Sequence, residues 1–163
     1  MEGLSIDVVS TTVRAAADVL VQVWPGIERA TELGRVLRDC TASLRECHGG
    51  SLWGPHGHAV LFRAGRSLGE CGLVGAAVDY WTEMATEASD ALGDGHPDTL
   101  NTRKDLAYCR GVAGDPVGAA AASEQLLADY LRVLGAGHPH TLGTRRALAR
   151  WQRQAGDARD RRW

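Results

Sequence analysis

Hydrophobic and polar positions follow a helical period along the whole chain. Apolar side chains recur every three or four residues, and no useful stretch alternates with the period of two that marks a strand. A first helix is predicted from Asp7 to Val23, ended by Trp24-Pro25 because a residue before proline disfavours helical backbone. Its apolar face is predicted to hold Val8, Val13, Ala16, Leu20 and Val23. A second helix is predicted from Ile27 to Glu46, with a break at Gly49-Gly50.

Beyond this break the sequence repeats with a shift of 42 residues. The segment Leu92–Arg103 realigns on Leu134–Arg145, and a fainter copy lies one period upstream. Such a period is typical of stacked helical units that bury a core only against their neighbours. We therefore predict an all-α solenoid of about seven helices. An N-terminal helical segment (1–50) is expected to pack on repeats at about 51–92, 93–134 and a partial 135–163.

Proline, aspartate and glycine predict the helix ends within each repeat. The first helices should start at prolines, where a missing N–H costs no hydrogen bond, namely at Pro55, Pro97 and Pro139. They should end near Cys71, Val112 and Gln154. The second helices should run from about Leu73 to Leu92 and from Pro116 to Leu134, with Asp115 as N-cap and Gly93 and Gly135 as terminators.

The third repeat lacks its second helix within this sequence. One face of the first helices should lie in the core, through Leu100, Ala107, Leu142 and Ala149. Without a covering helix, Leu142, Leu148 and Trp151 are expected to be partly exposed. Exposed apolar patches of this kind mark association surfaces, so we expect this C-terminal end to pack against another chain, as in self-association, or against the remainder of a longer protein.

Composition excludes several classes of function. Apolar residues make up 44% of the chain and charged residues 23%, as in ordinary globular proteins, and the net charge of −2 does not predict binding to nucleic acid or membranes. The most apolar stretch, 15–24, contains Asp18 and is too short to span a bilayer. Cys40 and Cys47 lie seven residues apart in a helix, about 10 Å and beyond disulfide reach. A reduced, cytoplasmic protein is therefore expected.

Two local motifs suggest chemistry without establishing it. Gly65-Arg66-Ser67-Leu68-Gly69 matches the nucleophile elbow of hydrolases, but that elbow needs a preceding strand and Ser67 is predicted inside a helix. Soft metal ligands gather at His56, His58 and Cys71, although only His56 and His58 show a ligand-like spacing. A small enzyme or a metal- or ligand-binding helical protein built on these three residues is the alternative hypothesis. His96 and His138 recur before helix-start prolines and are predicted to cap helices.

The repeat phrase Gly-His-Pro-Asp-Thr-Leu-x-Thr-Arg-x-x-Leu-Ala at residues 95–107, with the Ala-Gly-Asp turn, resembles the tetratricopeptide repeat. The resemblance is to the 42-residue, kinesin-light-chain-like form, most closely over 92–157 and more loosely over 20–91. Such arrays are abundant in actinobacterial signalling proteins, where they often follow an NB-ARC-type nucleotide-binding domain. The resemblance implies a right-handed solenoid that binds a protein or peptide in a groove lined by the first helices. It implies neither a cofactor nor an ATPase, since no phosphate-binding G-x-x-x-x-G-K-[ST] loop is present.

The resemblance also places the candidate groove residues. Repeats of this form commonly carry Asn before the Leu-Ala pair, and this chain has Asp105 and Ala147 there. We therefore expect ligand choice to depend on charge. The predicted groove set holds six cations and one carboxylate, which favours an acidic ligand. It consists of Phe62, Arg63, Arg66, Asn101, Lys104, Asp105, Tyr108, Arg146, Arg150 and Arg153.

Overall fold

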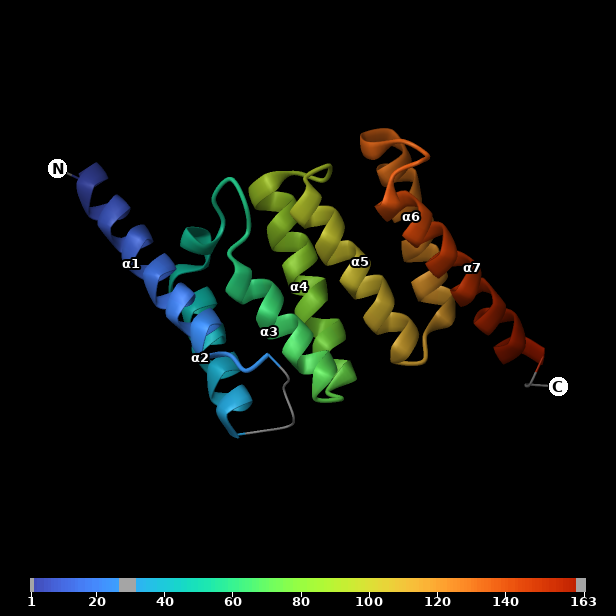
Figure 1. Cartoon of the computed structure of the whole chain (residues 1–163), viewed down its shortest axis with the longest axis horizontal. Coiled ribbons are helices and arrows are strands. Elements are labelled where there is room, and N and C mark those ends of the chain that lie inside the picture. The colour runs from blue at the N-terminus through green and yellow to red at the C-terminus, as the bar shows by residue number, and fades with distance from the viewer. Residues whose placement is uncertain (1, 27–31, 161–163) are drawn as a thin grey trace. The chain divides into compact units, whose positions relative to one another are not determined.

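The computed structural model describes residues 2–26 and 32–160, which form α-helices joined by short connections (Figure 1). The helices are α1 (Glu2–Val23), α2 (Glu32–His48), the short 3₁₀ helix η1 (Gly49–Leu52), α3 (Ala59–Glu70), α4 (Val74–Leu92), α5 (Pro97–Val112), α6 (Pro116–Leu134) and α7 (Pro139–Asp160). The predicted all-α class with seven α-helices is confirmed over these residues. The predicted start of the second helix at Ile27 lies outside the described residues.

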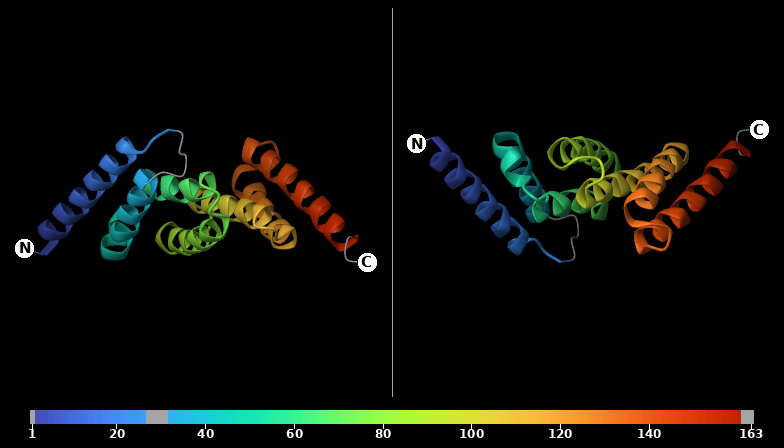
Figure 2. Two further views of the ribbon diagram at one scale, coloured as in Figure 1. Left: turned by 90° about the horizontal axis from the view of Figure 1, so that it is seen from below. Right: turned by 90° about the horizontal axis from the view of Figure 1, so that it is seen from above.

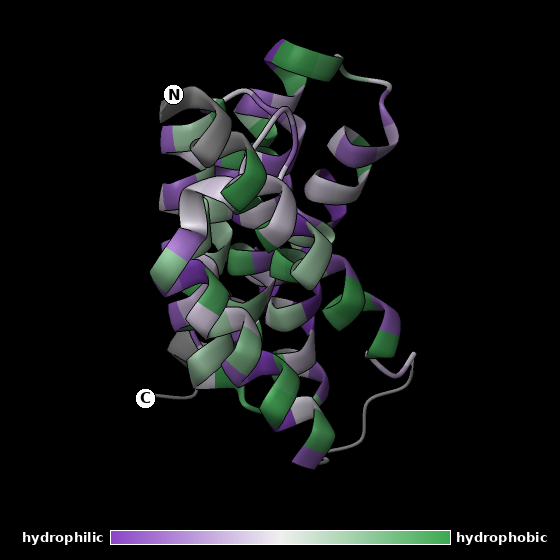
Figure 3. Ribbon diagram, turned by 90° about the vertical axis from the view of Figure 1, so that its left-hand side faces the viewer, coloured by the Kyte–Doolittle hydropathy of each residue, from purple (hydrophilic) through white to green (hydrophobic). Residues whose placement is uncertain are grey.

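Green hydrophobic and purple hydrophilic stretches alternate along the ribbons in Figure 3. The chain divides into two compact units, described separately below. Unit 1 comprises residues 1–73 and 90–92, and unit 2 comprises 74–89 and 93–163. The boundary near residue 50, between an N-terminal segment and the repeats, stays a prediction.

Unit 1 packs α1, α2, η1 and α3 around a small apolar core. Leu52 of η1 and Val60 and Leu61 of α3 are fully buried. Val13 and Ala17 supply the buried face of α1, whereas Val8 and Val23 are 64% and 51% exposed. The predicted apolar face of α1 is therefore confirmed for Val13 and wrong for Val8 and Val23, because Ala17 and Trp24 share the buried face with Val13.

Unit 2 contains the clearest repeat geometry. Helix α6 packs against both α5 and α7, as the two views of Figure 2 show. Leu100 of α5 forms a buried cluster with Leu126 and Tyr130 of α6. The predicted bounds of α5 and α6 are confirmed, and Asp115 caps α6 by accepting a hydrogen bond from the Gly118 amide at 2.8 Å.

Histidines cap the first helices of the repeats. His96 Nδ1 accepts from the Asp98 amide at 3.1 Å, and His138 Nδ1 from the His140 amide at 3.2 Å. His58 caps α3 in the same way, through the Val60 amide. Pro97 and Pro139 start their helices as predicted. The prediction for Pro55 was wrong: α3 starts at Ala59, because His58 rather than Pro55 provides the start signal in this copy.

The end of the third repeat also differs from its prediction. Helix α7 does not stop near Gln154 but continues through Gly156 to Asp160. The equivalent glycines, Gly72 and Gly114, turn the chain with φ of 74° and 93°. Gly114 leads into α6, which packs against α5 and buries Leu126 and Tyr130 there. No such helix follows Gly156 within these residues, so continued helical hydrogen bonding is the more stable state.

Candidate functional site

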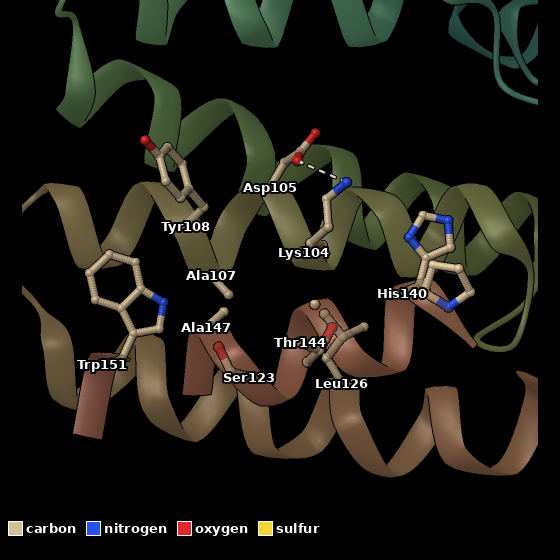
Figure 4. Close-up of a pocket in the computed structure, with 12 residues that line it drawn as sticks. Lys104, Asp105, Ala107, Tyr108, Ser123, Leu126, His140, Thr144, Ala147 and Trp151 are labelled. Atoms are coloured by element: carbon tan, nitrogen blue, oxygen red, sulfur yellow. Dashed lines mark ion pairs between the residues drawn. The ribbon is translucent and has the colours of Figure 1, made fainter. Parts of the chain in front are cut away.

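A groove runs between α5 and α7 in unit 2, with α6 as its floor. It encloses a pocket of about 350 Å³ (Figure 4). Lys104, Asp105, Ala107 and Tyr108 of α5 form one wall, and Ser123 and Leu126 of α6 lie beneath. The opposite wall is α7, with Pro139, His140, Gly143, Thr144, Ala147 and Trp151. The space exists because the facing positions Ala107, Gly143 and Ala147 carry side chains no larger than a methyl group.

The lysine and the carboxylate of this groove lie on one wall, that of α5. Lys104 Nζ donates to Asn101 Oδ1 at 2.6 Å and lies 3.6 Å from an Asp105 oxygen, the ion pair dashed in Figure 4. The pocket lining thus contains one lysine and one carboxylate. It offers both a hydrogen-bond donor and an acceptor to a peptide backbone above an apolar floor.

Aromatic side chains close one end of the groove. Tyr108 is 55% exposed, and its ring meets Trp151 edge-on with centroids 6.4 Å apart. The Arg150 guanidinium lies 3.9 Å from the Trp151 ring centroid, a close cation–π contact. Trp151 itself is buried, so the expectation that it would be partly exposed was wrong. Its indole fills the space above Gly111 of α5, which the repeat pattern alone did not reveal.

The arginines predicted for the groove occupy a neighbouring side of α7. Arg146, Arg150 and Arg153 are exposed, and only Arg150 reaches the aromatic end of the groove. Helical spacing turns Arg146 and Arg153 away from Ala147 and Trp151. Asn101, Lys104, Asp105, Tyr108 and Arg150 are thus brought together, while Arg146 and Arg153 flank them.

The remaining predicted groove residues belong to unit 1. Phe62 is buried, and Arg66 is exposed. Arg63 is engaged within its own unit: Nη2 donates to the Pro25 carbonyl at 3.0 Å, Nη1 pairs with Glu70 at 3.1 Å, and the guanidinium covers the Trp24 ring. A ligand would therefore have to compete with three existing contacts for Arg63.

Two buried groups near the groove hold their protons firmly. Burial, and secondarily the Asp105 charge, raise the pKa of the Cys109 thiol to about 11 and the pKa of the Tyr130 hydroxyl to about 12. Both groups are therefore neutral at pH 7. Neither is activated as a nucleophile, because nucleophilic cysteines have lowered pKa values.

A second pocket, of about 390 Å³, lies at the start of α5 and α7. Its lining includes Asp98, Asn101, Tyr130, His138 and His140. The His140 ring stacks on Tyr130 at 5.7 Å with an interplanar angle of 15°. His140 lines both pockets, and no sequence signal singled it out, since only its neighbour His138 recurs in the repeat.

The residues of the alternative hypothesis are not brought together. His58 and Cys71 are the N-cap and C-cap of the 12-residue helix α3, so they lie about 20 Å apart along its axis. His58 is occupied by the Val60 amide and by Asp18, 3.1 Å from Nε2. Ser67 lies inside α3, fully buried, and accepts a 2.6 Å hydrogen bond from Arg38. No strand precedes it among the described residues, so the nucleophile elbow is absent there.

The fold resembles that of a solved repeat protein. A crystal structure of nearly identical TPR-like repeats, from a candidate kinesin light chain of Podosopora anserina, superposes with a TM-score of 0.62 at 19% identity. The match covers 92% of this chain and 68% of the other. It shows that the chain has a TPR-like repeat fold. Neither a family model nor a curated protein sequence matches the chain.

None of the helices in residues 2–26 and 32–160 has the length and apolar character needed to cross a bilayer.

Proposed function

We propose that this chain is a protein-binding repeat module and that the groove between α5 and α7 receives a peptide segment. Repeat folds of this kind present extended surfaces to other proteins. The observation that carries the proposal is the pocket itself. Small side chains on two facing helices leave about 350 Å³ above an apolar floor, beside a lysine and a carboxylate. An extended peptide can place an apolar side chain there while its backbone pairs with Lys104 and Asp105.

The finer features of the function are part of this proposal. Arg146, Arg150 and Arg153 flank the groove, and arginine pairs bidentately with carboxylates, so a peptide with acidic residues beside its apolar anchor is favoured. In the cell the module acts as a cytoplasmic adaptor or as the sensor array of a signalling protein. The resemblance to kinesin-light-chain-like repeats supports this role, and self-association through the C-terminal end is compatible with it.

Selection from a displayed peptide library against the full chain tests the proposal. Ala147→Trp fills the pocket, so peptides selected by the wild-type chain should lose binding to this variant by at least about tenfold. Ala121→Trp, at an exposed position of α6, is the matched control and should leave binding unchanged. Peptides that bind both variants equally would show that the groove is not the binding surface.

The acidic preference has its own test. Replacing Arg146, Arg150 and Arg153 by Ala should weaken binding of selected acidic peptides at physiological salt without unfolding the chain. Exposed charged side chains and exposed cation–π contacts each contribute only about 1 kcal/mol or less to stability. Unchanged affinity would remove these arginines from the contact surface while leaving the groove proposal intact.

A further inference from the structure

One face of α7 lacks the cover that its repeat equivalent on α5 has. We call this face the open α7 stripe: Leu142, Arg145, Ala149 and Gln152, which are all exposed. A shift of 42 residues places them on Leu100, Arg103, Ala107 and Arg110 of α5. Helix α6 covers that α5 face, so Leu100 is 1% exposed, whereas Leu142 is 41% exposed. The expected exposure of Leu142 is therefore confirmed, whereas the prediction that Leu142 and Ala149 face the core was wrong.

The α5–α6 contact shows what chemistry fits the open α7 stripe. Leu126 and Tyr130 of α6 pack on Leu100. Asp129 of α6 pairs with Arg103, with Oδ2 3.3 Å from Nη1. A complementary helix therefore presents an apolar residue, an acid three positions later and an apolar residue directly after it. Arg145, the equivalent of Arg103, makes no ion pair with any other described residue.

Helix α1 carries such a face, and it too is uncovered. We call it the α1 stripe: Val8, Thr12, Ala15, Val19 and Val23, which lie opposite the buried Val13 and Ala17. Val8, Val19 and Val23 are 64%, 56% and 51% exposed. Apart from Thr12, whose hydroxyl donates to the Val8 carbonyl, the α1 stripe is apolar along four helical turns, which is unusual for a solvated helix face.

The spacing of apolar and acidic residues along α1 matches that along α6. Ala15, Asp18 and Val19 repeat the apolar, acidic, apolar pattern of Leu126, Asp129 and Tyr130. The Asp18 side chain is 67% exposed while its Oδ1 contacts His58. A carboxylate accepts several hydrogen bonds, so Asp18 can receive an arginine at the same time.

The chain segments that contain the two stripes differ in net charge. Residues 141–163 contain seven arginines and two aspartates, whereas residues 2–23 contain three acids and one arginine, Arg14. Opposite charges steer two surfaces together and set their register. The same two helices, α1 and α7, are therefore favoured by the apolar side chains, by the position of Asp18 and by the difference in charge.

We propose that the α1 stripe of one copy covers the open α7 stripe of a second copy, with Asp18 paired to Arg145. This goes beyond peptide binding and identifies the partner of the C-terminal face as the chain itself. The contact is heterologous, since each copy contributes a different surface. A single pair of helices buries a small area, so the association is weak and depends on protein concentration.

Sedimentation of the full chain over a range of micromolar concentrations tests the proposal. The average mass should rise with concentration and fall with added salt. Val19→Asp and Leu142→Asp should each raise the dissociation constant by about tenfold or more, because each places a charge in an apolar contact. Val117→Asp, at a 51% exposed valine of α6 outside both stripes, is the matched control and should not change it.

A mixing experiment tests the heterologous geometry. The Val19→Asp chain keeps its open α7 stripe and the Leu142→Asp chain keeps its α1 stripe, so an equimolar mixture should form a one-to-one dimer that neither variant forms alone. The double variant Asp18→Arg/Arg145→Asp should likewise recover association lost in each single charge variant. Circular dichroism melting of every variant separates loss of association from loss of folding.

Three results would overturn the proposal. The first is a chain that stays monomeric throughout, including one that binds a helix of another protein on the open α7 stripe. The second is association that persists unchanged in both Val19→Asp and Leu142→Asp. The third is a mixture of the two variants that shows no dimer, because that result indicates contact between like surfaces.

Discussion

The indole of Trp151 lies against Gly111, and a Cβ at residue 111 would be only 2.3 Å from Cη2 of the ring. Two further ring carbons, Cζ2 and Cζ3, would be 2.5 Å away. Glycine therefore sets the distance between α5 and α7 at the aromatic end of the groove. The buried tryptophan fills the volume that a side chain at residue 111 would otherwise occupy.

Gly111→Ala is expected to destabilise the fold. Overpacking against the buried indole costs about 1–3 kcal/mol, which exceeds the gain of roughly 1 kcal/mol from replacing a helical glycine by alanine. Urea unfolding followed by circular dichroism measures the change. Gly143→Ala is the control, because a Cβ there meets no atom within 4 Å, so this variant should be as stable as the wild type or more stable. The loss should shrink in a Trp151→Ala background, and an undiminished loss would contradict the role of the indole.

Gly156 and Gly114 occupy the same repeat position with different backbone conformations, so alanine should affect them oppositely. Gly114 has a φ of 93°, which alanine adopts only with strain, and Gly114→Ala should cost about 1 kcal/mol or more. Gly156 lies inside α7 with open space around it, so Gly156→Ala should stabilise by roughly 0.5–1 kcal/mol. Thermal melting of both variants checks this. A destabilised Gly156→Ala chain would indicate a turn at that glycine in solution.

Helix α5 depends on an imidazole cap. His96→Ala removes the acceptor for the Asp98 amide and should cost about 1 kcal/mol of unfolding free energy. His96→Asn should recover most of this loss, since asparagine is among the best N-cap residues. Denaturant titration of the three chains gives the comparison. Equal stabilities for the alanine and asparagine variants would show that the hydrogen bond contributes nothing.

Alkaline pH should destabilise the fold in part through Cys109. Its pKa is raised from 9.0 to about 11 in the folded chain, so the folded state holds this proton more tightly than the unfolded state does. The stability it contributes is present below about pH 9 and is lost as the pH rises through 11. Cys109→Ala should flatten the fall of unfolding free energy between these pH values. Cys40→Ser, at an exposed thiol, should leave the fall unchanged.

The sequence pattern predicted helix bounds correctly where interactions within a few residues determine them. The 42-residue shift predicted helices α5 and α6 with their bounds, because proline, the Asp115 cap and the positive-φ glycines act within a few residues. The same shift placed Asn101, Lys104, Asp105 and Tyr108 on one helix face. These residues do lie together, although their role in binding stays a prediction.

The features that the sequence pattern predicted wrongly depend on tertiary contacts. Helical period alone cannot choose between the Val8 and Val13 faces of α1, since both carry apolar residues and only packing against α2, η1 and α3 separates them. The burial of Trp151 required the distant Gly111 to be its neighbour. In the same way, the continuation of α7 through Gly156 depends on whether a covering helix is present.

Threonine side chains hydrogen-bond to the connections that precede α5 and α7. Thr99 Oγ1 donates to the Gly93 carbonyl and Thr141 Oγ1 to the Gly135 carbonyl, each at 2.8 Å, while Thr99 also lies 3.1 Å from the Ala88 carbonyl. Each threonine thereby fixes the number of residues between one helix end and the next helix start. Homologous chains should therefore tolerate inserted residues poorly between Gly135 and Thr141. Length variation should instead accumulate at the α5–α6 turn around Gly114, which has no equivalent threonine hydrogen bond.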